Sequence, residues 1–247
     1  LKVLRDLAGS IDVYAAAVVL QGINDGDSLV ETCRWLDDAG AKGLILMRFA
    51  NEPHQGLILG NGPILPGQPV MDIPAFRDLV EDLNGMFRMK ISGTPLYDPD
   101  IGSPFAIRRE PFLLSRLPKA ERRVTVVSGS VAAPFIGEIL DRRGFPGNVI
   151  AVEKEIACLI TAQDLKEVEL GECEETVIIP GRAFVHDHDA ATILSADGTS
   201  RQVIRGPETL TADAETSMGM RREDVLQMEI EGFSDLIRLI NRYGRPD

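Results

Sequence analysis

The sequence predicts an α/β protein with parallel sheets, and three observations lead to that class. Short apolar runs alternate with longer stretches whose apolar positions recur at helical spacing. Clusters of glycine, asparagine and aspartate separate these runs and supply turns. The alternation starts afresh after residues 117–123, which hold a proline and a charged stretch. A strand followed by a helix and another strand is a βαβ unit, so the expected sheets are parallel.

The first βαβ unit covers residues 11–49. Its opening run is almost wholly apolar, which suits a strand that is buried on both faces. Turn formers follow it, and the next stretch has the capping residue and the apolar spacing of a helix. The expected elements are the strand Ile11–Leu20, the turn Gln21–Gly26, a helix from Asp27 or Ser28 to Ala39, the stop Gly40–Gly43 and the strand Leu44–Phe49.

A long loop rich in proline and glycine, Asn51–Pro69, follows this unit. Loops of such length in compact domains are usually functional or disordered, and the apolar content of this one favours an ordered conformation. The chain itself begins with Leu1 in a helix-like run, and we expect it to be the later part of a longer protein. The remaining elements expected in this half are the helix Ile73–Arg88, the strand Met89–Ser92 and the structured loop Gly93–Pro104.

The second half repeats the α/β pattern, and the two expected domains are residues 1–118 and 119–247. Apolar strands are again followed by turns and helical patterns, and an amphipathic helix closes the chain. The expected strands are Val124–Val127, Asn148–Val152 and Thr176–Ile179; the turn is Ser128–Ser130, and the helices are Ala132–Arg142, Thr161–Glu167 and Asp224–Tyr243.

Composition narrows the possible partners. The chain has 38 acidic and 26 basic residues, a net charge of −12, which argues against nucleic acid or an anionic membrane as a partner. No stretch of about 18 consecutive apolar residues occurs, as a membrane-spanning helix would need. The three cysteines are too few and too scattered for a disulfide framework. We therefore expect a cytoplasmic protein.

Familiar catalytic motifs are missing from the sequence. It contains no dinucleotide-binding glycine pattern, no phosphate loop, no nucleophile elbow and no closely spaced cysteine pair. The stretch His186-Asp187-His188-Asp189 has three open interpretations: a metal site, a polar loop or a cofactor contact.

Several short segments can be interpreted in two ways. Ser128–Ala133 follows a predicted strand with small residues, which suits either exposed backbone amides for a planar or anionic ligand or simply a tight turn. Arg182 follows another strand and can hold an anion or pair at the surface. Cys158 stands in an apolar run, where a thiol is usually buried and inert. Glu215, in a loop of small residues, is either solvated or a partner for a guanidinium.

Seven segments together resemble one family, methanogenesis marker protein 10. This family comprises cobalamin-dependent radical S-adenosylmethionine methyltransferases of methanogenic archaea. The resemblance runs along the whole chain, and the long proline- and glycine-containing loops make it specific. The segments are Val19–Asp25, Ala41–Asn51, Gly56–Asn61, Ser92–Asp98, Ile101–Arg108, Ile156–Thr161 and Val177–Asp187.

The resemblance implies a reaction and a fold. The family methylates an arginine δ-carbon in the α subunit of methyl-coenzyme M reductase, using cobalamin, S-adenosylmethionine and a 4Fe–4S cluster. It implies the last strands of a partial (β/α) barrel followed by a C-terminal α/β cobalamin-binding domain. The family's Cys-x3-Cys-x2-Cys cluster loop does not occur here. Four missing strand–helix units would amount to about 125 residues, so this chain alone is expected to bind no cluster and to be inactive.

The resemblance also implies roles for individual residues. Leu159, next to Cys158, is expected from the resemblance to place an apolar side chain under the cobalt. The sequence has no Asp-x-His-x-x-Gly motif, the usual source of a histidine ligand to cobalt. Glu215 is the expected catalytic residue, holding the substrate guanidinium. The expected corrin contacts are Ser128, Gly129, Ala132, Ala133, Cys158, Leu159, Pro180, Gly181, Arg182, Ala183 and Phe184, and the expected S-adenosylmethionine contacts are Gln21, Asn24, Met47, Arg48 and Asn51.

Two other functions remain open at this point. One is a cobalamin-binding module that carries the cofactor and performs no radical chemistry. The other is an unrelated hydrolase or transferase that uses His186 and Asp187 as acid and base.

Overall fold

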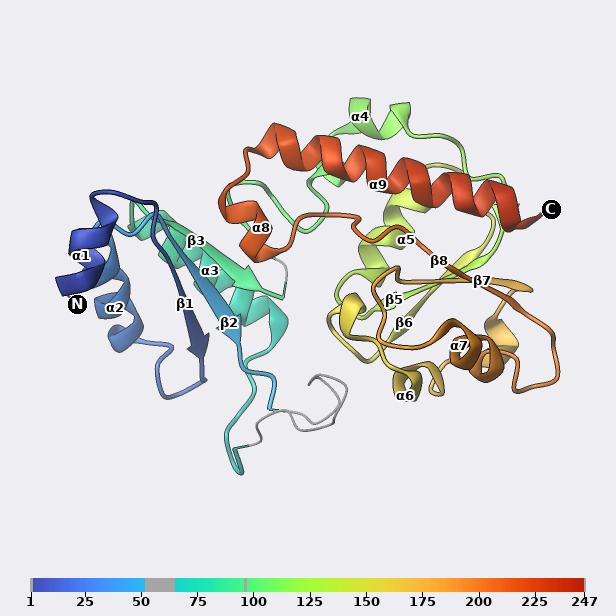
Figure 1. Ribbon diagram of the computed structural model, residues 1–247, viewed down its shortest axis with the longest axis horizontal. Coiled ribbons are helices and arrows are strands. Elements are labelled where there is room, and N and C mark those ends of the chain that lie inside the picture. Colours follow the sequence, from blue (N-terminus) through green and yellow to red (C-terminus); the bar gives the residue numbers. More distant parts are fainter. Residues whose placement is uncertain (1, 52–64, 96, 247) are drawn as a thin grey trace. The chain divides into compact units, whose positions relative to one another are not determined.

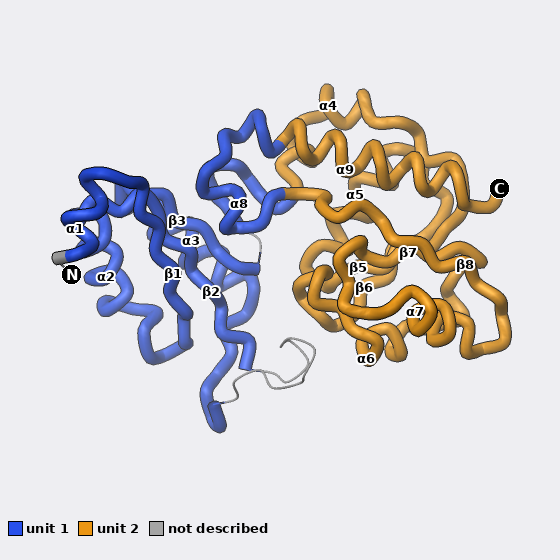
Figure 2. Tube along the Cα trace, in the orientation of Figure 1, with its two compact units in different colours: residues 1–51, 63–104, 212–225 blue, residues 52–62, 105–211, 226–247 orange. Residues whose placement is uncertain are grey.

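A computed structural model describes residues 2–51, 65–95 and 97–246. The segment Gly56–Asn61 and the greater part of the long loop expected at Asn51–Pro69 lie outside the described residues. The chain forms two compact units, which Figure 2 shows in different colours. The described residues of the first unit are 2–51, 65–95, 97–104 and 212–225, and those of the second are 105–211 and 226–246.

The first unit is built on a three-stranded parallel sheet whose strands are adjacent in chain order. Its strands are β1 (Tyr14–Val19), β2 (Gly43–Arg48) and β3 (Lys90–Thr94), and its helices are α1 (Lys2–Ala8), α2 (Asp27–Asp38), α3 (Ile73–Met86) and α8 (Ala214–Met218) (Figure 1).

Helices α2 and α3 pack on one face of this sheet because their apolar residues recur at helical spacing. The buried side chains of α2 include Leu29 and Cys33, those of α3 include Phe76 and Val80, and they form one core with the sheet residue Leu44. On the opposite face, α8 packs against β2 and β3. The segment 212–225 thus belongs to the first unit although it follows most of the second in sequence.

The second unit has a four-stranded parallel sheet in the order β6-β5-β7-β8. Helices α5 and α9 lie on one side of it and α6 and α7 on the other (Figure 1). The strands are β5 (Thr125–Gly129), β6 (Asn148–Val152), β7 (Thr176–Ile179) and β8 (Gln202–Arg205); the helices are α4 (Pro111–Arg116), α5 (Ala133–Asp141), α6 (Ala162–Leu165), α7 (Asp187–Ile193) and α9 (Arg222–Tyr243). The other elements in the described part of this unit are the 3₁₀ turns Ala106–Arg109, Ala157–Leu159 and Leu170–Glu172 and the short pair β4 (Arg122–Arg123) and β9 (Arg245–Pro246).

Both faces of the two central strands, β5 and β7, are buried, as their apolar sequences predict. Val127, Val177 and Ile179 point into a core that also contains Leu165 of α6 and Ala190 of α7. Buried strands without alternation are typical of a parallel sheet that is covered by helices on both sides.

Glu229 of α9 is a fully buried carboxylate, and it holds the start of the second unit in place. Its oxygens accept hydrogen bonds from the backbone N–H groups of Ala106 at 3.1 Å and Ile107 at 2.8 Å, and from the Thr211 hydroxyl at 2.5 Å. Burial raises the pKa of this carboxyl, although the hydrogen bonds and the charge of Arg108 lower it. No pattern in the sequence indicates this role, because a glutamate in an amphipathic helix is ordinarily solvated.

The structure confirms the mixed α/β class with parallel sheets. It differs from the expectations in the extent of the units: residues 105–118 belong to the second unit, and 212–225 to the first. Several elements, among them α4, α7, α8 and β8, were not expected. Among the described residues, no helix is both long enough and apolar enough to span a membrane.

Candidate functional site

The sheet of the second unit has a topological switch point between β5 and β7. The connection that leaves β5 leads to β6 on one side, and the connection that leaves β6 leads to β7 on the other side of β5. Ligands of open parallel sheets bind outside the carboxyl ends of the strands at such a point. Gly129 ends β5 and Pro180 follows β7, so two candidate segments that are distant in sequence meet at this edge.

The small residues at this edge are buried, and larger side chains form its surface. Ser128 and Gly129 belong to β5, not to the expected turn, and the side chain of Ser128 faces away from solvent. The buried candidates are Ser128, Gly129, Ala132, Ala133 and Ala183; the half-buried ones are Cys158, Leu159, Pro180 and Gly181; the exposed ones are Arg182 and Phe184. The small residues therefore shape the edge, and the larger ones are the groups that a ligand would meet.

Two glycines let neighbouring backbone segments approach the ends of β5 and β7. A Cβ atom on Gly129 would lie 2.7 Å from the carbonyl oxygens of Lys154 and Glu155. A Cβ atom on Gly181 would lie 2.6 Å from the carbonyl oxygen of Gly206. Both distances are shorter than any normal contact, so glycine is required here for close backbone packing.

The loop that follows β5 is also fastened to the end of β6. The N–H of Ser130 donates to the carbonyl of Lys154 at 2.9 Å, and the Ser130 hydroxyl donates to the carbonyl of Glu153 at 3.3 Å. The backbone N–H of Ser130, which the sequence offered as a possible anion contact, is therefore used within the protein.

The segment that carries Cys158 and Leu159 is a 3₁₀ turn, Ala157–Leu159, beyond the end of β6. Sequence analysis placed Cys158 in an apolar run and favoured a buried thiol, whereas both side chains are half-buried. The next residues join this segment to the loop after β7, because the N–H of Phe184 donates to the carbonyl of Ile160 at 2.7 Å.

A buried ion pair supports this segment from within the unit. The Lys154 ammonium lies 3.6 Å from a carboxylate oxygen of Asp164, and both side chains are almost fully buried. The same carboxylate accepts hydrogen bonds from the N–H and the hydroxyl of Thr161 at 2.7 and 2.8 Å, which caps α6. These contacts fix the chain between Leu159 and α6.

Arg205, at the end of β8, organises the loop that follows β7. Its guanidinium donates to the carbonyls of Gly181 at 3.0 Å, Ala183 at 3.1 Å and Val185. Its Nε lies 2.6 Å from a carboxylate oxygen of Asp187. Sequence analysis missed this arginine because it did not recognise the strand that carries it.

The His186–Asp189 stretch forms the start of α7. His186 is the residue before the helix, and Asp187 and Asp189 lie in its first turn, where acidic residues favour the helix dipole. The Asp187 carboxylate is engaged by Arg205, and His188 is exposed with its Nδ1 3.4 Å from the Thr192 hydroxyl. Within the described chain, no three His, Cys, Asp or Glu side chains are grouped to hold a metal ion.

At the carboxyl edge of the first sheet, candidate side chains are bound to the protein's own backbone. Asn24 accepts a hydrogen bond from the N–H of Leu20 at 2.7 Å and donates to the carbonyl of Val18 at 2.8 Å. Asn51, whose φ is 52°, accepts from the N–H of Leu65 at 2.7 Å and donates to the carbonyl of that residue at 3.0 Å. These amides stabilise the loops after β1 and β2.

The other candidates at this edge divide into engaged and exposed groups. Arg48 donates to the carbonyl of Met71 at 2.7 Å. The carbonyl of Gln21 accepts from the side chain of Gln68 at 2.7 Å, which ties together the segments that follow the two strands. Met47 is 36% exposed and presents its thioether side chain at the surface of the sheet.

Glu215 lies in α8 and belongs to the first unit, not to a loop of the second. Asp213 caps this helix by accepting a hydrogen bond from the N–H of Thr216 at 2.7 Å. The Lys90 ammonium anchors its other end, because it donates to the carbonyl of Ser217 at 2.8 Å and lies 2.7 Å from the buried Asp98 carboxylate. Glu215 itself is exposed.

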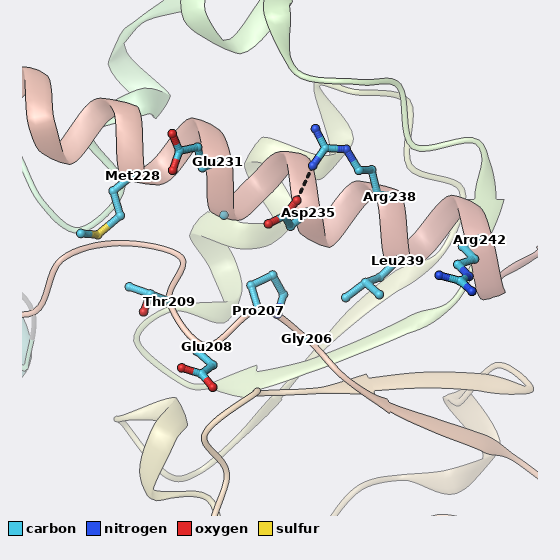
Figure 3. Close-up of a pocket in the computed structure, with 11 residues that line it drawn as sticks. Gly206, Pro207, Glu208, Thr209, Met228, Glu231, Asp235, Arg238, Leu239 and Arg242 are labelled. Carbon is cyan, nitrogen blue, oxygen red and sulfur yellow. Dashed lines mark hydrogen bonds and ion pairs between the residues drawn. The ribbon is translucent and has the colours of Figure 1, made fainter.

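A cavity of about 610 Å³ lies in the second unit between α9 and residues 206–209 (Figure 3). Leu239 projects from α9 on the side of Pro207, and Asp235 and Arg238 form an ion pair within the helix. None of the residues proposed from the sequence lines this cavity.

No protein-family model and no curated protein matches the sequence. Among solved structures, a mandelate oxidase mutant with the C4a-OH-FMN adduct aligns with 96% of this chain and 58% of its own, at 15% identity and a TM-score of 0.27. Mandelate oxidase with (S)-4-hydroxymandelic acid aligns with 96% of this chain and 60% of its own, at 15% identity and a TM-score of 0.19. The chain thus spans less than two thirds of these proteins, and likeness at such TM-scores carries no functional argument.

Proposed function

We propose that the second unit binds cobalamin at the carboxyl edge of its sheet. We further propose that the chain is part of a cobalamin-dependent radical S-adenosylmethionine enzyme that methylates an arginine δ-carbon in the α subunit of methyl-coenzyme M reductase. One observation carries the proposal. Two segments on which the resemblance rests, Ile156–Thr161 and Val177–Asp187, meet at the switch point, joined by the hydrogen bond from Phe184 to Ile160.

The groups at this edge fit a large ring with an apolar face and polar arms. Leu159 and Phe184 offer apolar surface, and Arg182 offers a cation for a phosphate or an amide oxygen. Leu159 would place a side chain without donor atoms against the ring and keep water from that face. When bound, cobalamin would supply the methyl group that is transferred, while S-adenosylmethionine and a 4Fe–4S cluster would supply the radical.

The first unit supports the remainder of the proposal. Its three parallel strands are adjacent in chain order with helices α2 and α3 on one face, which is the arrangement of a segment of a (β/α) barrel. Glu215 would hold the substrate guanidinium, since a carboxylate can accept two parallel hydrogen bonds from it. Asp213 and Lys90 hold the helix that carries Glu215, so its carboxylate stands on a fixed element.

The test is an absorption titration of the purified chain with hydroxocobalamin. We expect a saturable change in the cobalt-sensitive bands, and the variant Leu159→His to shift the bound spectrum because an imidazole can coordinate the metal. Leu170→His is the matched control, since Leu170 is also a half-buried leucine of a 3₁₀ turn but lies elsewhere in the unit.

Two results would contradict the proposal. Absence of saturable binding would remove cobalamin as the ligand of this edge. Binding with identical spectra in the wild type, Leu159→His and Leu170→His would show that Leu159 does not face the cobalt.

A further inference from the structure

Exposure alternates along the loop that follows β7. Ala183 is 7% exposed and Val185 is half-buried, whereas Arg182 is exposed and Phe184 is 47% exposed. The Arg182 guanidinium and the Phe184 ring are therefore both accessible on this loop. Between β7 and α7 the loop holds only a turn at Gly181 and Arg182 and an isolated bridge between Phe184 and Thr161, so no strand or helix sets this alternation.

The Arg205 guanidinium is the cause of this alternation. It binds the carbonyls of three alternate residues, Gly181, Ala183 and Val185, and thereby draws those residues inward. The residues between them are directed outward as a consequence. A single planar cation with five donors in a fixed fork can serve several acceptors at once, which a lysine ammonium on a flexible chain does poorly.

The two outward side chains are free to bind a ligand. Throughout the part of the chain that the structure describes, Arg182 makes no hydrogen bond and no ion pair. The N–H of Phe184 is fixed to Ile160, so the position of its ring relative to the Leu159 segment is set by the backbone. A free cation and a fixed aromatic ring therefore stand on the same short loop at the switch point.

Arg201 provides an internal comparison at the opposite end of β8. It is 8% exposed and also binds two backbone carbonyls, those of Leu194 and Leu170 at 2.8 and 2.7 Å, and forms a two-pronged ion pair with Asp197. It fastens segments that carry none of the candidate ligand contacts. An arginine that binds backbone carbonyls thus stands at each end of β8, Arg201 just before the strand and Arg205 as its last residue.

We propose that Arg205 is a positioning residue, which sets Arg182 and Phe184 as the pair of side chains that contact the ligand of the second unit. This inference rests on the proposed function, because it takes cobalamin as that ligand. Arg182 would meet a phosphate or an amide oxygen of the cofactor, and the Phe184 ring would cover part of its apolar surface.

The experiment compares Arg205→Gln with Arg201→Gln in three measurements. These are the hydroxocobalamin dissociation constant, amide hydrogen exchange over residues 181–187 without ligand, and the thermal midpoint. We expect Arg205→Gln to weaken binding by about tenfold and to speed exchange in that loop, because bonds to a charged donor are lost. Arg201→Gln should lower the thermal midpoint and leave the dissociation constant within about twofold.

Two further variants keep the test sharp if Arg205→Gln folds poorly. Arg205→Lys retains the charge and should not restore binding, because an ammonium cannot reproduce the fork. Asp187→Asn removes one partner of the guanidinium and should weaken binding by about threefold, half of the effect on a free-energy scale.

The outcomes separate this inference from the proposed function. If the wild type does not bind cobalamin, the proposed function is overturned. Hydrogen exchange in the ligand-free variants still shows whether Arg205 holds residues 181–187 in place. Unchanged exchange over residues 181–187 in Arg205→Gln overturns the inference. Equal losses of affinity in the Arg205 and Arg201 variants also overturn it, because they would show a purely structural effect.

Discussion

The carboxyl edges of the two sheets use their polar side chains in opposite ways. At the edge of the first sheet, the amides of Asn24 and Asn51 are bound to backbone groups of their own loops. At the edge of the second sheet, Arg205 holds the loop after β7 by hydrogen bonds to its backbone carbonyls. Arg182 is left without a partner among the described residues. A polar residue at a strand end is therefore available to a ligand only where another group stabilises the loop.

The contrast follows from where the backbone groups of each loop find their hydrogen-bond partners. Each irregular loop contains N–H and C=O groups that need partners, because leaving them unpaired and buried is costly. In the first unit the loop's own side chains supply those partners. In the second unit they come from Arg205, and from close backbone packing at Gly129 and Gly181.

The largest expected effect is that of Gly129→Ala on the stability of the second unit. The added Cβ would meet two carbonyl oxygens at 2.7 Å and the Ala157 N–H, all of them backbone atoms that cannot rotate away. We expect a loss of about 3 kcal/mol in the free energy of unfolding, measured by urea denaturation, because overpacking against backbone forces the segments apart.

Gly85→Ala is the control in the first unit. Gly85 lies in α3, and nothing lies within 4 Å of the position of an added Cβ. Alanine there should stabilise the protein by about 0.5–1 kcal/mol, because it is the better helix former. Similar effects of the two alanines would show that the end of β5 is not closely packed.

Glu229→Ala tests whether a buried carboxylate fastens the start of the second unit as Arg205 fastens the loop after β7. The change leaves two backbone N–H groups and the Thr211 hydroxyl without their acceptor. We expect a loss of about 2 kcal/mol, since buried donors would be left unsatisfied. Urea denaturation at several pH values measures it.

The loss of unfolding free energy in Glu229→Ala should depend on pH with a definite sign. Burial raises the pKa of Glu229 in the folded protein, so the folded state binds its proton more tightly than the unfolded state. The stability that this linkage contributes is fully present below the ordinary carboxyl pKa and is lost as the pH rises through the raised value. The cost of Glu229→Ala should therefore shrink with increasing pH, and a cost that grows with pH would contradict the assigned direction.

The sequence was sufficient to predict elements that have strong periodicity. Residues 148–152 and 176–179 form strands with the expected bounds, and the last helix begins within two residues of the expected position. The strand β8 was missed because only Val203 and Ile204 are apolar between polar neighbours. The helix α8 was missed because five residues are too few to show a periodic pattern.

For the candidate site, the sequence indicated the segments but not the burial of their residues. Ser128 is buried because it belongs to β5. The loop that carries Ala183 and Phe184 is bound by Arg205, a residue that approaches from another strand. Likewise, the attachment of α8 to the first unit depends on Lys90, which lies far from Glu215 in sequence. Contacts of this kind follow from tertiary structure and leave no local signal in the chain.

The smallest expected effects compare the two edges directly, through Asn24→Ala and Arg182→Gln. Removing the Asn24 amide breaks two hydrogen bonds to the backbone at the end of β1 and should cost about 1 kcal/mol of stability. Removing the Arg182 charge breaks no hydrogen bond or ion pair within the described chain. The free energy of unfolding should therefore change by less than about 0.5 kcal/mol. Cobalamin affinity should respond in the reverse order: reduced by Arg182→Gln and unaltered by Asn24→Ala. Equal changes in stability for both variants would contradict this contrast. They would show that polar side chains at the two edges do not differ in being bound to the protein's own backbone or left accessible.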